Sequence, residues 1–168
     1  MGYNKLMKKG FTLIELLIVV AIIGILAAVG AAVIPNILKN AKKNAAIANH
    51  QTVVDFIKTS LVQCDLGEAK VMITENFTGL DCPGKTPRTV IVATGKALSN
   101  FAKNPYGAVR KDFGDTAIRE GCTPDSDIYV GYNCLETSNN NARVATCFQL
   151  PCKDVTSENV MRTFITVE

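Results

Sequence analysis

The distribution of hydrophobic and polar positions divides the chain into two parts. Residues 16–34 contain no charged residue, and Glu15 is the only charge among the apolar residues just before them. A helix needs about 20 apolar residues to cross a bilayer, so this segment is long enough to span a membrane. After Pro35, apolar residues recur at three- and four-residue spacing between lysines. This periodicity predicts one helix from Thr12 to about Val62, roughly 75 Å long.

The pattern changes after Asp65, where turn residues separate short runs of strand-forming residues. We expect strands at Lys70–Thr74, Thr89–Ala93, Asp127–Tyr132, Arg143–Leu150 and Met161–Val167, a short helix at Lys96–Lys103, and loops at Asn104–Gly107 and Ser138–Asn141. The expected fold class is therefore α+β, with a long N-terminal helix packed on a small antiparallel sheet.

Pro35 lies inside the predicted helix. Proline has no amide hydrogen and its ring crowds the carbonyl one turn earlier, so we expect a kink or local melting between Gly30 and Pro35. An alternative interpretation is that Pro35 marks the point where the helix leaves the membrane.

Glu15 restricts the interpretation of the first segment. A carboxylate in the apolar interior of a membrane costs roughly 2.5–3.5 kcal/mol, so a chain that keeps one needs a partner for it. A secretory signal peptide has a shorter apolar run followed by a small-residue cleavage site, and no clear site of that kind follows here. A plain membrane anchor fits the length of the run but leaves Glu15 unexplained.

The sequence from Lys8-Lys9-Gly10 through Phe11-Thr12-Leu13-Ile14-Glu15 into the apolar run resembles the class III leader of type IV pilins and pseudopilins. The resemblance covers roughly residues 5–60, and the glycine, the aromatic residue and the glutamate all fall in register. It implies that a prepilin peptidase cuts after Gly10 and N-methylates Phe11.

The resemblance also implies a role for Glu15, which would be the fifth residue of the mature chain. In this family the matching glutamate pairs with the N-terminal ammonium of a neighbouring subunit. A buried ion pair with good geometry recovers much of the cost of a lone buried charge. Glu15 would then align helices during assembly and would have no catalytic part.

The implied domain organisation has four parts: a cleaved leader at 1–10, a transmembrane and filament-core segment at 11–34, an amphipathic continuation at 35–63, and a β-rich globular head at 64–168. The precursor would be a single-pass protein of the inner membrane, and the assembled subunit would lie in an extracellular pilus. The implied partners are other copies of the subunit, the prepilin peptidase and the inner-membrane assembly machinery.

Charge adds little to this picture. The formal net charge of +3 includes Lys5, Lys8 and Lys9 of the leader, and without them the basic and acidic side chains balance. No strong field for nucleic acid follows from that total. DNA binding would need an exposed basic patch, for which the only candidate is the cluster Arg110, Lys111 and Arg119; a solvated face explains this cluster as well.

The six cysteines all follow the apolar segment, as expected for disulfides formed in an oxidising compartment. They are Cys64, Cys82, Cys122, Cys134, Cys147 and Cys152. Many connectivities are open, and pairing sequence neighbours gives Cys64–Cys82, Cys122–Cys134 and Cys147–Cys152. Each disulfide would contribute roughly 2–4 kcal/mol to the stability of the fold.

A zinc site is excluded by the absence of close cysteine pairs and by the single histidine, His50. We interpret His50 as a packing or surface residue of the helix.

No catalytic motif is found, so we expect a protein that is not an enzyme and that needs no cofactor. A membrane-anchored redox enzyme would need a C-x-x-C-like setting, which is missing. Some pseudopilins bind calcium, for which Asp112 with Asp115 and Asp125 with Asp127 are candidates. Neither pair follows an EF-hand pattern, and solvated loop acids are the favoured interpretation.

The sequence therefore favours a structural subunit of a type IV pilus-like filament used in adhesion, motility or DNA uptake. Two alternatives share the same first helix. A type II secretion pseudopilin would typically be shorter and have calcium-binding loops, and six cysteines would be unusual there. A minor pilin that binds DNA would need the basic patch.

Overall fold

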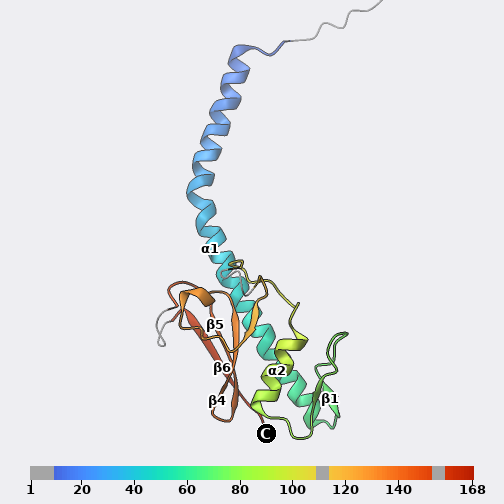
Figure 1. The fold of residues 1–168 in the computed structure, drawn as a ribbon. Coiled ribbons are helices and arrows are strands. Elements are labelled where there is room, and N and C mark those ends of the chain that lie inside the picture. Colours follow the sequence, from blue (N-terminus) through green and yellow to red (C-terminus); the bar gives the residue numbers. More distant parts are fainter. Residues whose placement is uncertain (1–9, 109–113, 153–157) are drawn as a thin grey trace, which may run out of the picture. The chain divides into compact units, whose positions relative to one another are not determined.

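The computed structural model describes residues 10–108, 114–152 and 158–168. The chain divides into two compact units, with the boundary between Lys39 and Asn40. The elements are α1 (Leu13–Asp65), β1 (Lys70–Val71), β2 (Leu80–Asp81), α2 (Pro87–Ala97), β3 (Ile118–Glu120), the 3₁₀ helix η2 (Asp127–Tyr129), β4 (Asn133–Ser138), β5 (Asn141–Cys147) and β6 (Val160–Thr166) (Figure 1).

The first unit consists of the N-terminal part of α1. Helix α1 continues through Gly30 and Pro35 without a break in its helical assignment, so the expected local melting is not found. The expected kink stays a prediction. By length and composition alone, α1 is able to cross a membrane, and the apolar window that meets this test has no buried residue.

The second unit is built on a four-stranded sheet with the order β3-β4-β5-β6. Strands β4, β5 and β6 pair antiparallel, whereas β3 pairs parallel with β4. The two-residue connection between β4 and β5 contains Asn139 with φ +53°, a left-handed conformation that asparagine adopts more readily than most residues. A separate two-stranded sheet pairs β1 with β2.

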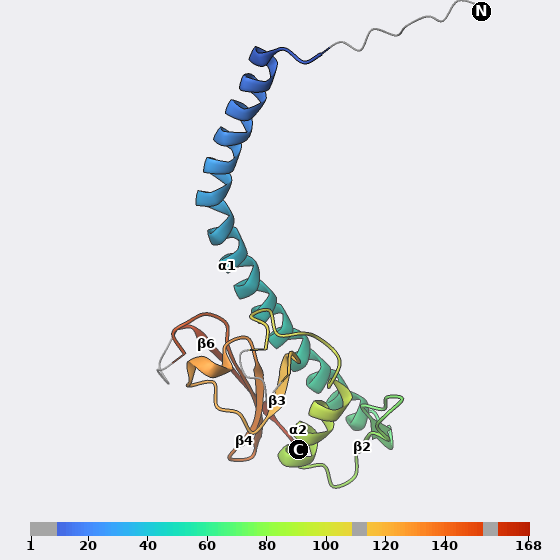
Figure 2. The same ribbon diagram turned by 45° about the horizontal axis from the view of Figure 1, so that its top comes forward.

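The main core lies between the C-terminal part of α1, helix α2 and one face of the four-stranded sheet, and Figure 2 shows this part of α1 and α2 alongside the strands. Helix α1 contributes buried residues at helical spacing, among them Val53 and Ile57, while β5 contributes Ala142 and Val144 from alternate positions. These two periodicities bury one stripe of a helix and one face of a sheet. The predicted α+β fold class with disulfides is confirmed, and its sheet is mixed because β3 is parallel.

Strands β5 and β6 lie where runs of strand-forming residues predicted them, within about three residues at each end. The strand expected at Lys70–Thr74 is reduced to the two residues of β1. The strand expected at Asp127–Tyr132 is wrong, because η2 and a turn occupy this segment. Strands β3 and β4 were not predicted.

The strand expected at Thr89–Ala93 is also wrong, because these residues lie inside α2. Thr86 caps this helix and Pro87 occupies its first turn, a combination typical of helix N-termini. The short helix expected at Lys96–Lys103 corresponds only to the last turn of α2, which ends at Ala97 and is followed by turns.

Candidate functional site

The N-terminal end of α1 brings together the residues that the sequence singled out for processing and assembly. Gly10 is exposed, and 85% of the surface of Phe11 is accessible to solvent. Both residues precede the first helical residue, Leu13. The bond between Gly10 and Phe11 therefore lies outside the helix.

Thr12 and Glu15 form hydrogen bonds with each other at the N-terminal end of α1. The backbone N–H and the hydroxyl of Thr12 both donate to Oε2 of Glu15, at 2.8 Å and 2.7 Å, and the N–H of Glu15 donates to the Thr12 hydroxyl oxygen at 3.4 Å. This reciprocal arrangement is a capping box, which satisfies backbone donors that a helix leaves free at its start.

Thr12 is a residue of this site that the sequence prediction missed, although its signal was present. A threonine followed three residues later by glutamate, just before an apolar run, is the usual sequence pattern of a capping box. Glu15 was interpreted only as a charge in an apolar segment. Both Thr12 donors converge on Oε2, so the other oxygen of this carboxylate keeps acceptor capacity for a further partner.

The surface of the first unit is apolar from Leu13 to Leu38, apart from Glu15 and Asn36. Between Leu13 and Leu38, the large hydrophobic residues that are exposed are Leu13, Ile14, Leu16, Leu17, Ile18, Val19, Val20, Ile22, Ile23, Ile25, Leu26, Val29, Val33, Ile34, Ile37 and Leu38. Soluble monomers rarely expose an apolar surface of this extent, because water disfavours it. The segment is suited to a lipid bilayer or to a bundle of similar helices.

Three disulfides stabilise the second unit, and they join the cysteines that are neighbours in sequence. The pairs are Cys64–Cys82, Cys122–Cys134 and Cys147–Cys152. The first ties the end of α1 to the segment after β2, the second ties the segment after β3 to β4, and the third closes a short loop after β5.

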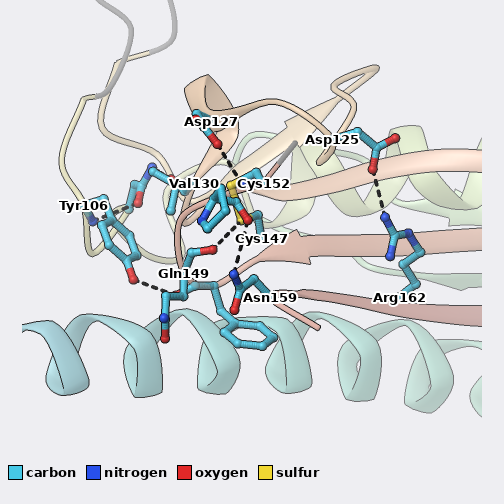
Figure 3. The surroundings of a disulfide bond; sticks show 12 residues. Tyr106, Asp125, Asp127, Val130, Cys147, Gln149, Cys152, Asn159 and Arg162 are labelled. Carbon is cyan, nitrogen blue, oxygen red and sulfur yellow. Dashed lines mark hydrogen bonds and ion pairs between the residues drawn. A yellow bond between two sulfur atoms is a disulfide. The ribbon is translucent and has the colours of Figure 1, made fainter. Parts of the chain in front are cut away.

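The two cysteines that close this loop, Cys147 and Cys152, are buried in a small second core with Val130 and Val160. Figure 3 shows this disulfide beside Val130. The hydroxyl of Tyr106 donates to the backbone carbonyl of Phe148 at 2.6 Å, in the middle of this loop. On α1, the Lys42 ammonium lies 5.8 Å from the centre of the Tyr106 ring, and the Lys43 ammonium lies 5.3 Å from that of Phe148. Cation–π attraction at these distances holds the loop on the helix.

The aspartates considered for calcium have other partners in this region. The side chain of Asp125 pairs with Arg162 at 2.8 Å, and Oδ1 of Asp127 accepts the backbone N–H of Cys152 at 2.7 Å. Asp115 pairs with Lys103 at 2.7 Å, and Asp112 lies outside the described residues. Within the described ranges, no three His, Cys, Asp or Glu side chains are grouped to hold a metal ion.

The basic cluster considered for DNA is described only in part. Arg110 and Lys111 lie outside the described residues, while Arg119 lies on β3.

The described residues thus contain an exposed apolar helix that begins with a capping box of Thr12 and Glu15, and a small α+β head with three disulfides. The family described as "Prokaryotic N-terminal methylation motif" matches residues 5–31. The type IV major alpha-pilin of Moraxella bovis is 32% identical over 67% of this chain and 73% of its own length. The type IV major fimbrial protein FimA of Dichelobacter nodosus is 35% identical over 58% of this chain, which spans 56% of that relative. No solved structure matches the chain.

The chain therefore belongs to the type IV pilin family, and it is a structural subunit of a pilus and not an enzyme. This confirms the resemblance seen in the leader.

Proposed function

We propose that the chain is inserted in the inner membrane through the first part of α1, cleaved after Gly10 and methylated on Phe11. It is then transferred into an extracellular filament whose centre is a bundle of these helices. The continuous exposure of large apolar residues from Leu13 to Leu38 is the observation that carries the proposal. Such a surface is stable in lipid before assembly and against other helices afterwards. The exposure of Gly10 and Phe11 supports access of a peptidase to the bond between them.

Glu15 has two possible contributions, which the geometry allows an experiment to separate. As the acceptor of both Thr12 donors, it stabilises the start of its own helix. As a charge, its remaining acceptor capacity suits the ammonium that cleavage creates on Phe11 of a neighbouring subunit. We propose that the second contribution sets the register of subunits in the filament.

The test compares Glu15→Ala with Glu15→Gln in cells that assemble the filament. The glutamine keeps an oxygen that accepts from Thr12 but carries no charge, whereas alanine loses both. Leaving a buried ammonium unpaired costs about 3–5 kcal/mol, so we expect both variants to reduce the yield of sheared filaments by about tenfold or more. Mass spectrometry of wild-type filaments should show a chain that begins with N-methylated Phe11.

Two outcomes would contradict parts of this proposal. If Glu15→Gln assembled as well as wild type while Glu15→Ala did not, the carboxylate would act only as a helix cap. If the wild-type chain kept its leader and carried no methyl group, cleavage and filament assembly by this route would be excluded. An immunoblot of membranes serves as the control that the variant subunits accumulate normally.

A further inference from the structure

His50 is the only histidine of the chain, and only 1% of its surface is accessible. It lies on the buried stripe of α1 and both of its ring nitrogens have partners on the sheet. Nδ1 is 2.9 Å from the hydroxyl of Thr146 on β5, and Nε2 is 2.8 Å from the hydroxyl of Thr163 on β6. One side chain therefore ties the helix to two strands.

The neighbouring hydrogen bonds decide which ring nitrogen carries the proton. The side-chain amide of Asn133 donates to the carbonyl of Ala117 at 3.1 Å, so its oxygen faces Thr146, whose hydroxyl donates to it at 2.7 Å. Because a hydroxyl has one proton, the Thr146 oxygen must accept from Nδ1–H of His50. Nε2 of the neutral ring then accepts from Thr163. Every donor in this chain of four hydrogen bonds has an acceptor, which is the favourable form of a buried polar network.

In the described part of the chain, the charged residues that line the hollow beside His50 come from its own helix. The register of β4, β5 and β6 places Asn133, Thr146 and Thr163 on the face toward α1. The charged residues of these strands, Glu136, Arg143 and Arg162, occupy the alternate positions, on the opposite face. The hollow beside His50 is lined by Gln51, Val54, Asp55, Lys58, Met161 and Thr163. Among these lining residues the charged ones are Asp55 and Lys58. Burial of the ring lowers the pKa of His50 to about 4.

We propose that His50 is an acid-sensitive catch, which holds the sheet on α1 while its ring is neutral and releases the edge strand β6 when the ring is protonated. Protonation adds an N–H at Nε2, where the Thr163 hydroxyl now donates, and it puts a positive charge on a buried ring whose two partners on the sheet are hydroxyls. Among the described residues, Glu120 of β3 shares this face of the sheet, but its carboxylate lies against Gly95 of α2. This inference does not depend on the proposed filament function.

The direction of the effect follows from proton linkage. In the unfolded chain the ring has its ordinary pKa of 6.5, and in the folded chain the pKa is about 4. Between these values the unfolded chain binds a proton that the folded chain does not, so stability falls as the pH falls from 6.5 toward 4. From the two pKa values, the folding equilibrium constant should decrease roughly 30-fold between pH 7.5 and pH 5 through this group alone.

The first experiment is an NMR titration of the full chain in detergent micelles with ¹⁵N-labelled histidine. A single histidine gives one pair of ring nitrogen signals, so no assignment is needed. We expect Nδ1 protonated and Nε2 unprotonated at pH 7, without titration above pH 5. Thr59→His adds a reference histidine at an exposed position of the same helix, which should titrate near 6.5. If the His50 ring titrated near 6.5, or if its proton were on Nε2, the proposal would be overturned.

The second experiment measures urea unfolding at pH 7.5 and pH 5 for wild type and for His50→Asn. The asparagine amide can donate to Thr146 but does not titrate. Wild type should lose roughly 30-fold more in its folding equilibrium constant than the variant over this pH range. Equal decreases of the folding equilibrium constant in both proteins would refute the proposal that His50 is an acid-sensitive catch. If His50→Asn does not fold, the NMR titration of His50 by itself tests the proposal.

Release of β6 is tested by hydrogen exchange, with β4 as the internal reference at each pH. Lowering the pH from 7.5 to 5 should reduce the protection of β6 amides from hydrogen exchange relative to that of β4 amides. An unchanged ratio would show that protonation does not open this edge.

Discussion

Gly131 illustrates at the scale of one residue how the second core is assembled. Its φ is +80°, and a Cβ atom at this position would run into the side-chain oxygen of Asn104 and into the ring of Tyr106. Asn104 is buried; its amide donates to the carbonyl of Val130 at 2.9 Å and its oxygen accepts the N–H of Tyr106 at 2.9 Å. Glycine at 131 therefore leaves the space in which Asn104 joins two loops.

We expect Gly131→Ala to lower the free energy of unfolding by about 2–4 kcal/mol, from backbone strain plus the clash with Asn104. Gly107→Ala is the matched control, because Gly107 has the same φ of +80° but no atom within 4 Å of its added Cβ. The control should lose only about 1 kcal/mol. Urea denaturation measures both, and equal losses would mean that the packing of Asn104 on Gly131 contributes nothing.

Helix α2 shows at the scale of an element why composition misled the prediction. The residues from Thr89 to Ala93 are mostly β-branched, which favours a strand. The structure instead buries Val90, Ile91 and Thr94 on one face of a helix. The start of this helix is determined by Thr86. Its hydroxyl oxygen accepts the N–H of Thr89 at 3.2 Å, and its own N–H donates to the Thr89 hydroxyl at 2.8 Å. Capping and tertiary burial together outweigh a weak strand propensity.

Thr86→Ala should lower the free energy of unfolding by about 1 kcal/mol, because it removes the side-chain acceptor at the start of α2. Thr52→Ala serves as the control. The Thr52 hydroxyl donates to the carbonyl of Ala48 within α1 and caps nothing, so its loss should change stability by less than about 0.5 kcal/mol. Thermal or urea unfolding of the two variants compares them directly, and a Thr86→Ala variant as stable as wild type would rule out the capping box as a source of stability.

At the scale of the whole molecule, the two units differ in how much of their apolar surface is exposed to solvent. In the described part of the first unit, residues 10–39, no residue is buried, whereas the buried residues of the second unit run from Ala46 to Ile165. The first unit needs lipid or other helices around it, and the second carries its own core and disulfides.

Removing residues 1–39 should therefore leave a head that is folded and soluble without detergent. We expect its free energy of unfolding to stay within about 1 kcal/mol of that of the full chain, because no described residue before Asn40 is part of the core. Size-exclusion chromatography and circular dichroism without detergent test this expectation. Ile57→Asp in the same truncated chain is the control that should unfold, since Ile57 is fully buried. An insoluble truncated chain would contradict the division into two units.

The candidate site at the start of α1 was predictable because its residues are contiguous. Gly10, Phe11 and Glu15 lie in one short motif. The disulfides were predictable for a similar reason, since each joins two cysteines that are neighbours in sequence. Closing a short loop costs less entropy than closing a long one, which favours such pairs. The role of Thr12 was also present in the motif but was overlooked.

The sequence by itself determined the long helix, the apolar first unit and the last two strands, because helical hydrogen bonds join residues four apart and strand alternation is a local pattern. Only the tertiary structure decided that β3 joins β4 in parallel, that α2 is a helix, and that His50 lies between Thr146 and Thr163. These partners of His50 are 96 and 113 residues away in the chain. Contacts over such separations depend on how helix and sheet pack against each other, and no periodicity along the chain encodes them.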